Sequence, residues 1–152
     1  MKKFIAIFLM FSLTLAAVSI QAQTLVTQTS TAGASKTTHT DADTSYHTID
    51  LAGSTNNFAI LNFVLKGTKT SGTVGGSAIL YASMDNSRWF HVTPDAGSDT
   101  ATLANGDNNF YWKFTGATGS GAHWRYYRLI VKTSGTQVST YQVRMLGRKV
   151  AN

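Results

Sequence analysis

The chain has 152 residues, the length of a single domain, with 13 Lys and Arg against seven acids and a formal net charge of +6. There is no cysteine, so disulfides, cysteine-ligated zinc, thiol nucleophiles and lipid attachment through cysteine are excluded. All seven acids are aspartate, and the absence of Glu beside plentiful Thr, Gly, Tyr and Phe favours strands and turns over helices.

The N-terminus has the order of a secretory signal peptide. Lys2 and Lys3 precede an apolar run from Phe4 to Ile20, and Ala22 then offers a small residue at a cleavage point. We expect residues 1–22 to be a signal peptide, which would make the protein secreted, periplasmic or exposed on the cell surface. The alternative is a retained membrane anchor, because the apolar run is at the short limit for spanning a bilayer.

Residues 23–45 are rich in Thr, Ser and Ala, with little apolar content after Leu25 and Val26. This composition predicts a flexible or extended lead-in that precedes the folded domain.

From Tyr46 onward, short apolar and β-branched runs alternate with turn signals built from Gly, Asp and Asn. Strands are predicted at Tyr46–Leu51, Asn57–Lys66, Ser77–Met84, Arg88–Thr93, Thr100–Ala104, Asn109–Thr115, His123–Thr133 and Gln137–Lys149. No window has a convincing helical period. We therefore expect an all-β fold: a single antiparallel β-sandwich of about eight strands, jelly-roll or Ig-like, over residues 46–150.

Three runs also indicate which side chains form the core. Alternation places Tyr141, Val143 and Met145 on one face of the last run. In the run before it, Tyr127, Leu129 and Val131 share a face. The run 58–65 is apolar on both faces, which predicts a strand in the middle of a sheet.

The segment from Lys69 to Val74 is similar to the segment from Lys132 to Val138, since both contain Lys-Thr-Ser-Gly-Thr. One interpretation is a duplicated hairpin unit. The other is that Ser-Gly is good turn chemistry between two Thr-rich strands.

No catalytic or metal-binding pattern is present. His39, His47, His91 and His123 have no zinc-ligand spacing, and there is no Gly-x-Ser-x-Gly elbow. The loops 95–99 and 105–109 are rich in oxygen ligands but lack the calcium-loop frame. We expect a protein that is not an enzyme, with no metal and no cofactor.

The segment Ser83–Trp89 predicts a tight hairpin. The Asp85 side chain would cap the turn, and Trp89 would start the return strand.

The aromatic residues supply the candidate binding site. The runs 110–114 and 124–128 place large rings on both faces of their strands, and one face of each must meet the core. Rings beside Lys and Arg on the other face suit sugar stacking, cation–π contacts or a subunit interface. The alternative is a second covered face. The candidate binding residues are Trp89, Tyr111, Trp112, Trp124, Tyr126 and Arg128.

The pattern Ser-x-Asp-x-Ser-x-Trp from Ser83 to Trp89, followed by the stretch from Tyr126 to Met145, resembles small all-β virion proteins of tailed phages, associated with the capsid or tail. Such proteins pair a Ser-x-Asp-Gly-x-x-Trp hairpin with a late strand that opens on two tyrosines and an arginine. The resemblance covers about half of the chain. It implies a structural or adhesive role in a particle, and it transfers no site residue.

Two functions therefore stay open. The first is a non-catalytic structural, assembly or adhesion module that forms a homo-oligomer or binds a protein partner in a larger assembly. The second is a carbohydrate-binding module of a secreted or surface protein, with a glycan as ligand. A nucleic-acid partner is not expected, because the basic residues are spread through the chain.

Overall fold

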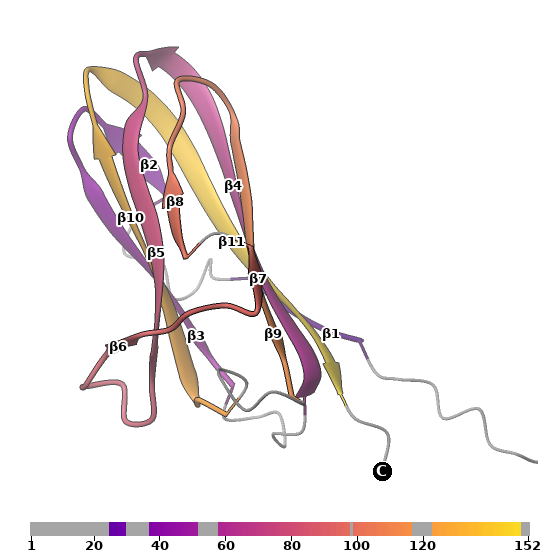
Figure 1. Cartoon of the computed structure of the whole chain (residues 1–152). Helices are drawn as coiled ribbons and strands as arrows, with labels where there is room; N and C mark the ends of the chain where they lie inside the picture. The colour runs from indigo at the N-terminus through magenta and orange to yellow at the C-terminus, as the bar shows by residue number, and fades with distance from the viewer. Residues whose placement is uncertain (1–24, 30–36, 52–57, 98, 117–122, 150–152) are drawn as a thin grey trace, which may run out of the picture.

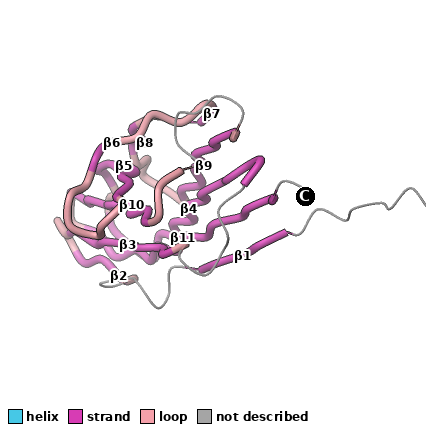
Figure 2. The backbone as a smooth tube through the Cα atoms, turned by 90° about the horizontal axis from the view of Figure 1, so that it is seen from below, coloured by secondary structure: helices cyan, strands magenta, loops and turns pink. Residues whose placement is uncertain are grey.

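The computed structural model describes residues 25–29, 37–51, 58–97, 99–116 and 123–149, which consist of strands and loops (Figure 1, Figure 2). The expected signal peptide, residues 1–22, lies outside the described residues. In the described ranges, no helix is long and apolar enough to cross a membrane.

The described residues form eleven strands, which pack as two antiparallel sheets of a β-sandwich. The strands are β1 Leu25–Thr29, β2 Thr38–Thr40, β3 Thr44–Asp50, β4 Phe58–Gly72, β5 Gly75–Ser83, β6 Phe90–His91, β7 Ala96–Gly97, β8 Thr100–Thr102, β9 Asn108–Thr115, β10 Tyr126–Ser134 and β11 Gln137–Lys149. Sheet A has the order β1-β11-β4-β9-β7, with β2 also paired to β11. Sheet B has the order β3-β10-β5-β6, with β8 also paired to β5.

The core lies between the sheets and follows the predicted alternation. Tyr141, Val143 and Met145 of β11 are buried, as predicted, and so are Tyr127, Leu129 and Val131 of β10. The ring centroids of Phe63 on β4 and Tyr127 on β10 are 4.6 Å apart, so this contact joins the two sheets. β4 pairs with β11 on one side and β9 on the other, which confirms the prediction of a central strand.

Two neighbouring connections carry the chain from one sheet to the other. β4 leads into β5, β10 leads into β11, and the crossings pair with each other, Gly72 opposite Gln137 and Gly75 opposite Ser134. Gly72 has a φ of +74°, and a Cβ there would lie 2.0 Å from the Thr136 carbonyl oxygen. The two similar Ser-Gly segments are therefore adjacent crossovers, each of which needs a glycine to turn.

All eight predicted strands are present, but the prediction of a lead-in at residues 23–45 needs correction. β1 and β2 fall within that stretch, and both pair with β11. His39 of β2 is completely buried. Thr-rich segments fit a pleated sheet because Thr is β-branched, so their low apolar content did not exclude a place in the fold. A further short strand, β7, forms at Ala96–Gly97, in the segment that the sequence analysis treats as a loop.

Candidate functional site

The structure divides the six predicted binding residues between three environments. Trp112 is completely buried in the core, so its prediction as a binding residue is wrong. Alternation turns its neighbour Tyr111 to the outer face of sheet A, where the side chain is 53% exposed. Trp89, Trp124, Tyr126 and Arg128 lie at one end of sheet B.

The outer face of sheet B carries two rings beside the Arg128 guanidinium, and a third ring, Tyr126, two residues away on the same face of β10. We call this the ring–arginine cluster and define it as Tyr46, Trp89, Tyr126 and Arg128. The Cζ atom of Arg128 is 3.8 Å from the Trp89 ring centroid and 5.8 Å from that of Tyr46. Both distances are within the range of cation–π attraction.

Polar contacts fix the Arg128 side chain in this position. Its Nε donates to Thr48 Oγ1 at 2.9 Å, and its Nη2 donates to Asn86 Oδ1 at 3.4 Å. Burial lowers the pKa of Arg128, and the nearby Tyr46 acts in the opposite direction. The guanidinium is thus charged, partly desolvated and held rigid, which suits recognition of a second surface.

Two more exposed apolar side chains, Phe90 and Met84, lie near this end of sheet B, and Phe90 is opposite the buried Ala82 and therefore on the core side of the sheet. Phe90 packs on Trp124 with ring centroids 5.6 Å apart, and Phe90 is 53% exposed. Met84, just past the end of β5, is 59% exposed. Of the large hydrophobic side chains that are exposed in the described residues, only Tyr111 lies away from this end of sheet B.

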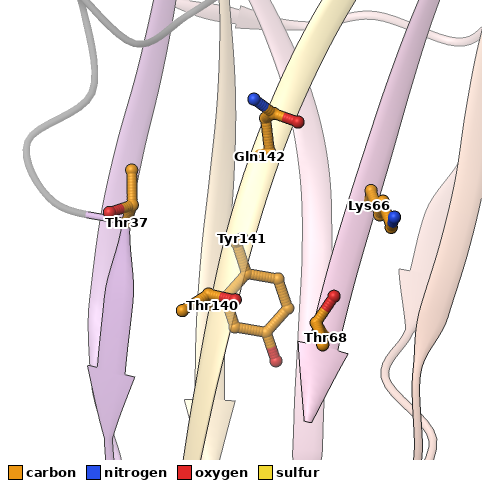
Figure 3. A pocket seen from close by; sticks show the side chains of 6 residues that line it. All are labelled: Thr37, Lys66, Thr68, Thr140, Tyr141 and Gln142. Carbon is orange, nitrogen blue, oxygen red and sulfur yellow. The ribbon is translucent and has the colours of Figure 1, made fainter. Parts of the chain in front are cut away.

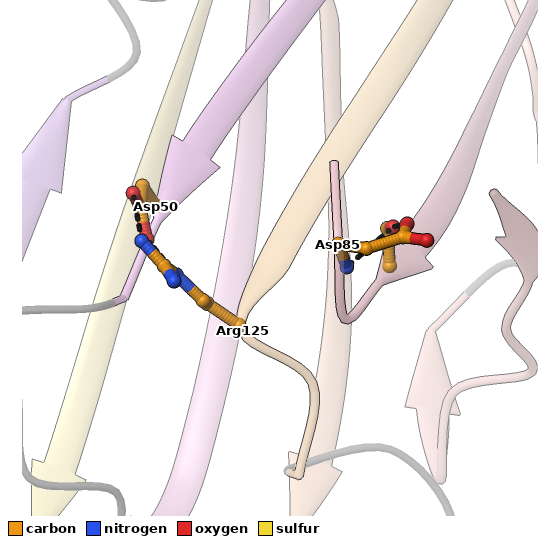
Figure 4. A network of polar contacts seen from close by, with 4 residues as sticks. Asp50, Asp85 and Arg125 are labelled. Carbon is orange, nitrogen blue, oxygen red and sulfur yellow. Dashed lines mark hydrogen bonds and ion pairs between the residues drawn. The ribbon is translucent and has the colours of Figure 1, made fainter. Parts of the chain in front are cut away.

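A capped turn carries Trp89 to the cluster, as the sequence predicts. Asp85 Oδ1 accepts hydrogen bonds from the backbone N–H groups of Ser87 and Arg88 at 2.9 and 2.8 Å, and from the Ser83 hydroxyl at 2.9 Å. These bonds, that from Arg88 first, lower the pKa of Asp85 to about 2. Asn86 takes the left-handed conformation, with a φ of 60°. Figure 4 shows Asp85 in this turn.

An ion pair borders the cluster on the side of β3. The Arg125 Nε is 3.3 Å from Asp50 Oδ1, and Figure 4 shows the two side chains meeting. The hydrogen bond to Asp50 is the main reason why the pKa of Arg125 is raised. The Arg125 guanidinium also lies 4.7 Å from the Tyr126 ring centroid. Both side chains of the pair are exposed, so the ion pair is a weak contributor to stability.

The outer face of sheet A is different in character. Two adjoining hollows, of about 360 and about 200 Å³, lie over β11, β4 and β9 and share Lys66 and Gln142. Figure 3 shows the larger one, with Thr37 facing it from beside β2. The smaller one adds Val64, Asn109 and Arg144 to the lining. We call the two together the basic hollow.

The strand register orders these side chains in rows. Val64 lies between Arg144 on β11 and Tyr111 on β9, and in the next row Lys66 lies between Gln142 and Asn109. Arg144 and the exposed ring of Tyr111 therefore lie on either side of Val64. They are two strand spacings apart, which is about 10 Å.

Between the sheets, two histidines lie in a buried polar network. His39 Nε2 lies 2.7 Å from Ser45 Oγ, which in turn lies 2.8 Å from His47 Nε2. His39 Nδ1 is 3.1 Å from Thr133 Oγ1. Burial, and secondarily the proximity of His39, lower the pKa of His47 to about 4. The network joins β2, β3 and β10 and is not open to a ligand, so its role is structural.

The oxygen-rich loops are engaged by the protein itself. Asp107 Oδ1 accepts from the Lys69 backbone N–H at 2.9 Å, and Asn105 Oδ1 accepts from Lys69 Nζ at 2.8 Å. The Asp95 carboxylate binds the hydroxyl and backbone N–H of Thr115. Within the described ranges, no three or more His or Asp side chains come together in a way that could hold a metal ion.

Neither a family model nor a curated protein sequence matches the chain. Solved structures do. The SPBc2 prophage-derived protein YomS is similar over 87% of this chain and 99% of its own, with 14% identity and a TM-score of 0.49. The CBM22-1 xylan-binding domain of Paenibacillus barcinonensis Xyn10C is similar over 86% and 97%, with 7% identity and a TM-score of 0.45. At this distance the likeness is one of β-sandwich fold, shared by phage-derived and carbohydrate-binding proteins alike, and it assigns no function.

Several residues of these surfaces were missed in the sequence. The sequence predicts a strand at Tyr46 but no role for it, because only the pairing of β3 with β10 brings its ring to Arg128. Lys66, Gln142 and Arg144 come together only because β4 and β11 are neighbours, and the sequence gives no signal for that pairing.

Proposed function

We propose that this chain is an exported, non-catalytic module that acts in assembly or adhesion and associates with a second copy of itself through the ring–arginine cluster. One observation supports this most strongly: Arg128 is held between Trp89 and Tyr46 on an outer sheet face. Trp, Tyr and Arg are the residues that most often dominate binding energy in protein interfaces.

The surroundings of the cluster support a protein contact more than sugar stacking. Arg128 occupies one face of the Trp89 ring, Arg125 lies over Tyr126, and Phe90 packs on Trp124. These rings have partners already and are not open platforms for a sugar. The Tyr46 ring, 43% exposed on the same face as Arg128, adds apolar area for a partner, and Tyr is enriched in interfaces.

In a two-fold interface the same patch of each copy meets itself, so a second copy needs no other kind of surface. The Tyr46 side chain is 43% exposed, so the Tyr46 ring of one copy can pack on the stacked Trp89 and Arg128 side chains of the other.

The absence of cysteine allows a direct test. A single cysteine is introduced by Ser87→Cys, in the exposed turn beside the cluster, or by Thr140→Cys, on an exposed position of sheet A. The full chain is purified as the expression host leaves it and treated with a short bismaleimide cross-linker. We expect a covalent dimer from Ser87→Cys alone. Equal cross-linking of both variants, or of neither, would contradict the proposed interface.

The second candidate function, a carbohydrate-binding module, is supported by a different surface. Tyr111 stands on the outer face of sheet A, exposed and next to the basic hollow. The two functions therefore use opposite faces and do not exclude each other.

A further inference from the structure

The basic hollow contains hydrogen-bonding side chains and the cations Lys66 and Arg144, and the exposed Tyr111 ring lies beside it. We propose that it binds a carboxylate-bearing saccharide, with Tyr111 stacking on a sugar ring and Lys66 and Arg144 binding the acid groups. This is a second site, separate from the ring–arginine cluster, and it specifies the ligand class of the second candidate function.

The outer face of sheet A is rich in positive charge. The outward positions of β4, β9 and β11 include four cations and no acid: Lys66, Lys113, Arg144 and Arg148. None of the four makes an ion pair with another described residue. The Asp95 carboxylate keeps its charge and lies at Thr115, two rows along β9 from Tyr111, and Asp107 is bonded to the Lys69 backbone. The part of the face around Lys66 and Arg144 is thus complementary to an anion.

The hollow also has what a sugar requires. The Tyr111 side chain is 53% exposed, and Val64 beside it gives an apolar floor for the C–H groups of a pyranose. Amide and hydroxyl groups line the rest of the hollow and can bond sugar hydroxyls. They belong to Asn109, Gln142, Thr37, Thr68 and Thr140.

The distances favour a saccharide over a nucleic acid. Arg144 and Tyr111 are about two strand spacings apart, about 10 Å, so one or two sugar units can stack on the ring and place a carboxylate at the guanidinium. Non-specific nucleic-acid sites instead combine a groove of many phosphate contacts with several stacking rings. Among the side chains that the structure describes, this face offers one exposed ring, Tyr111, and a few cations.

The site is tested by calorimetric titration of the full chain with polygalacturonate, alginate and hyaluronan. We expect at least one of them to bind, and methyl-esterified polygalacturonate, which keeps the sugar rings but loses the charge, to bind at least about tenfold more weakly than the acid form. Poly-L-glutamate carries carboxylates without any sugar, and single-stranded oligothymidylate carries phosphates without a pyranose ring, so both should bind more weakly than the best glycan. The proposal is overturned if no acidic glycan binds, if the ester binds equally, or if either of these two control polymers binds more tightly.

Variants locate the site. Arg144→Gln and Tyr111→Ala should each weaken binding by roughly tenfold, while Tyr111→Phe, which keeps the ring, should retain it. Lys132→Gln is the matched control, because it removes one exposed cation from the opposite sheet. An equal loss in Lys132→Gln would reduce the effect to net charge and overturn the site. The Ser87→Cys cross-link should be the same in Arg144→Gln, so failure here is distinguishable from failure of the assembly interface.

Discussion

The two outer faces of the sandwich use arginine in opposite ways. On sheet B, the Arg128 guanidinium lies beside Trp89 and Tyr46 and is bonded to Thr48, so it already has partners within the molecule. On sheet A, Arg144 is exposed and unpaired among the described residues, beside the equally exposed Lys66. An arginine that is held by its neighbours, as Arg128 is, gives a rigid surface that another protein can contact. An exposed arginine such as Arg144 can bind an anion. The faces thus differ in whether their arginine already has ring and hydrogen-bond partners among the described residues.

The largest expected effect is on the free energy of unfolding, and it distinguishes the buried Trp112 from its exposed neighbour Tyr111. Trp112→Ala should lower the free energy of unfolding by about 4 kcal/mol, because it opens a cavity in the core. Tyr111→Ala should change it by less than about 0.5 kcal/mol, since that side chain faces solvent. Urea denaturation of both variants measures the difference. A large loss in Tyr111→Ala would mean that this ring has a structural role and is not available for a ligand.

Low pH should destabilise the fold by protonating His47, which is buried between the two sheets. The pKa of His47 is about 4 in the folded chain and 6.5 when unfolded, so the unfolded state binds the proton first as pH falls. Stability should therefore be complete above pH 6.5 and decrease by about 3 kcal/mol as pH falls to about 4.

Urea denaturation across this pH range tests the assignment to His47. His47→Gln should be less stable at neutral pH, since it disturbs the bond to Ser45, but should show a flatter pH dependence. An unchanged slope in the variant would assign the acid sensitivity to other groups.

A smaller effect distinguishes the two arginines. Arg128→Ala should cost about 1 kcal/mol of stability, because it removes a cation–π contact and a hydrogen bond at a partly buried position. Arg144→Ala should be neutral within about 0.5 kcal/mol. Thermal unfolding of the two variants at one pH makes the comparison. Equal losses would remove the contrast between an enclosed and an open arginine.

The core residues of a strand could be predicted from the sequence only where apolar and polar residues alternate clearly. Alternation in β10 and β11 was enough to predict their core residues, because apolar and polar positions differ clearly there. In β9 the run Phe110–Phe114 is aromatic at neighbouring positions, so the choice between Tyr111 and Trp112 as the buried ring was not evident. Register with β4 decides it, since Trp112 lies opposite the buried Phe63.

The sites depended on long-range pairing and were harder to predict. His39 bonds a Thr133 hydroxyl 94 residues away, so its polar, Thr-rich surroundings gave no sign of burial. The ring–arginine cluster joins β3, β10 and the 84–89 turn, and the basic hollow joins three strands of the other sheet. In contrast, the Asp85 turn was predictable because all of its bonds are local.

Light scattering of the wild-type chain, Arg128→Ala and Arg144→Ala over a range of concentrations tests the central claim most directly. The account predicts a concentration-dependent dimer for the wild type and for Arg144→Ala, and a monomer for Arg128→Ala. A wild-type chain that stays monomeric at every concentration, or an Arg144→Ala variant that dissociates as Arg128→Ala does, would contradict it.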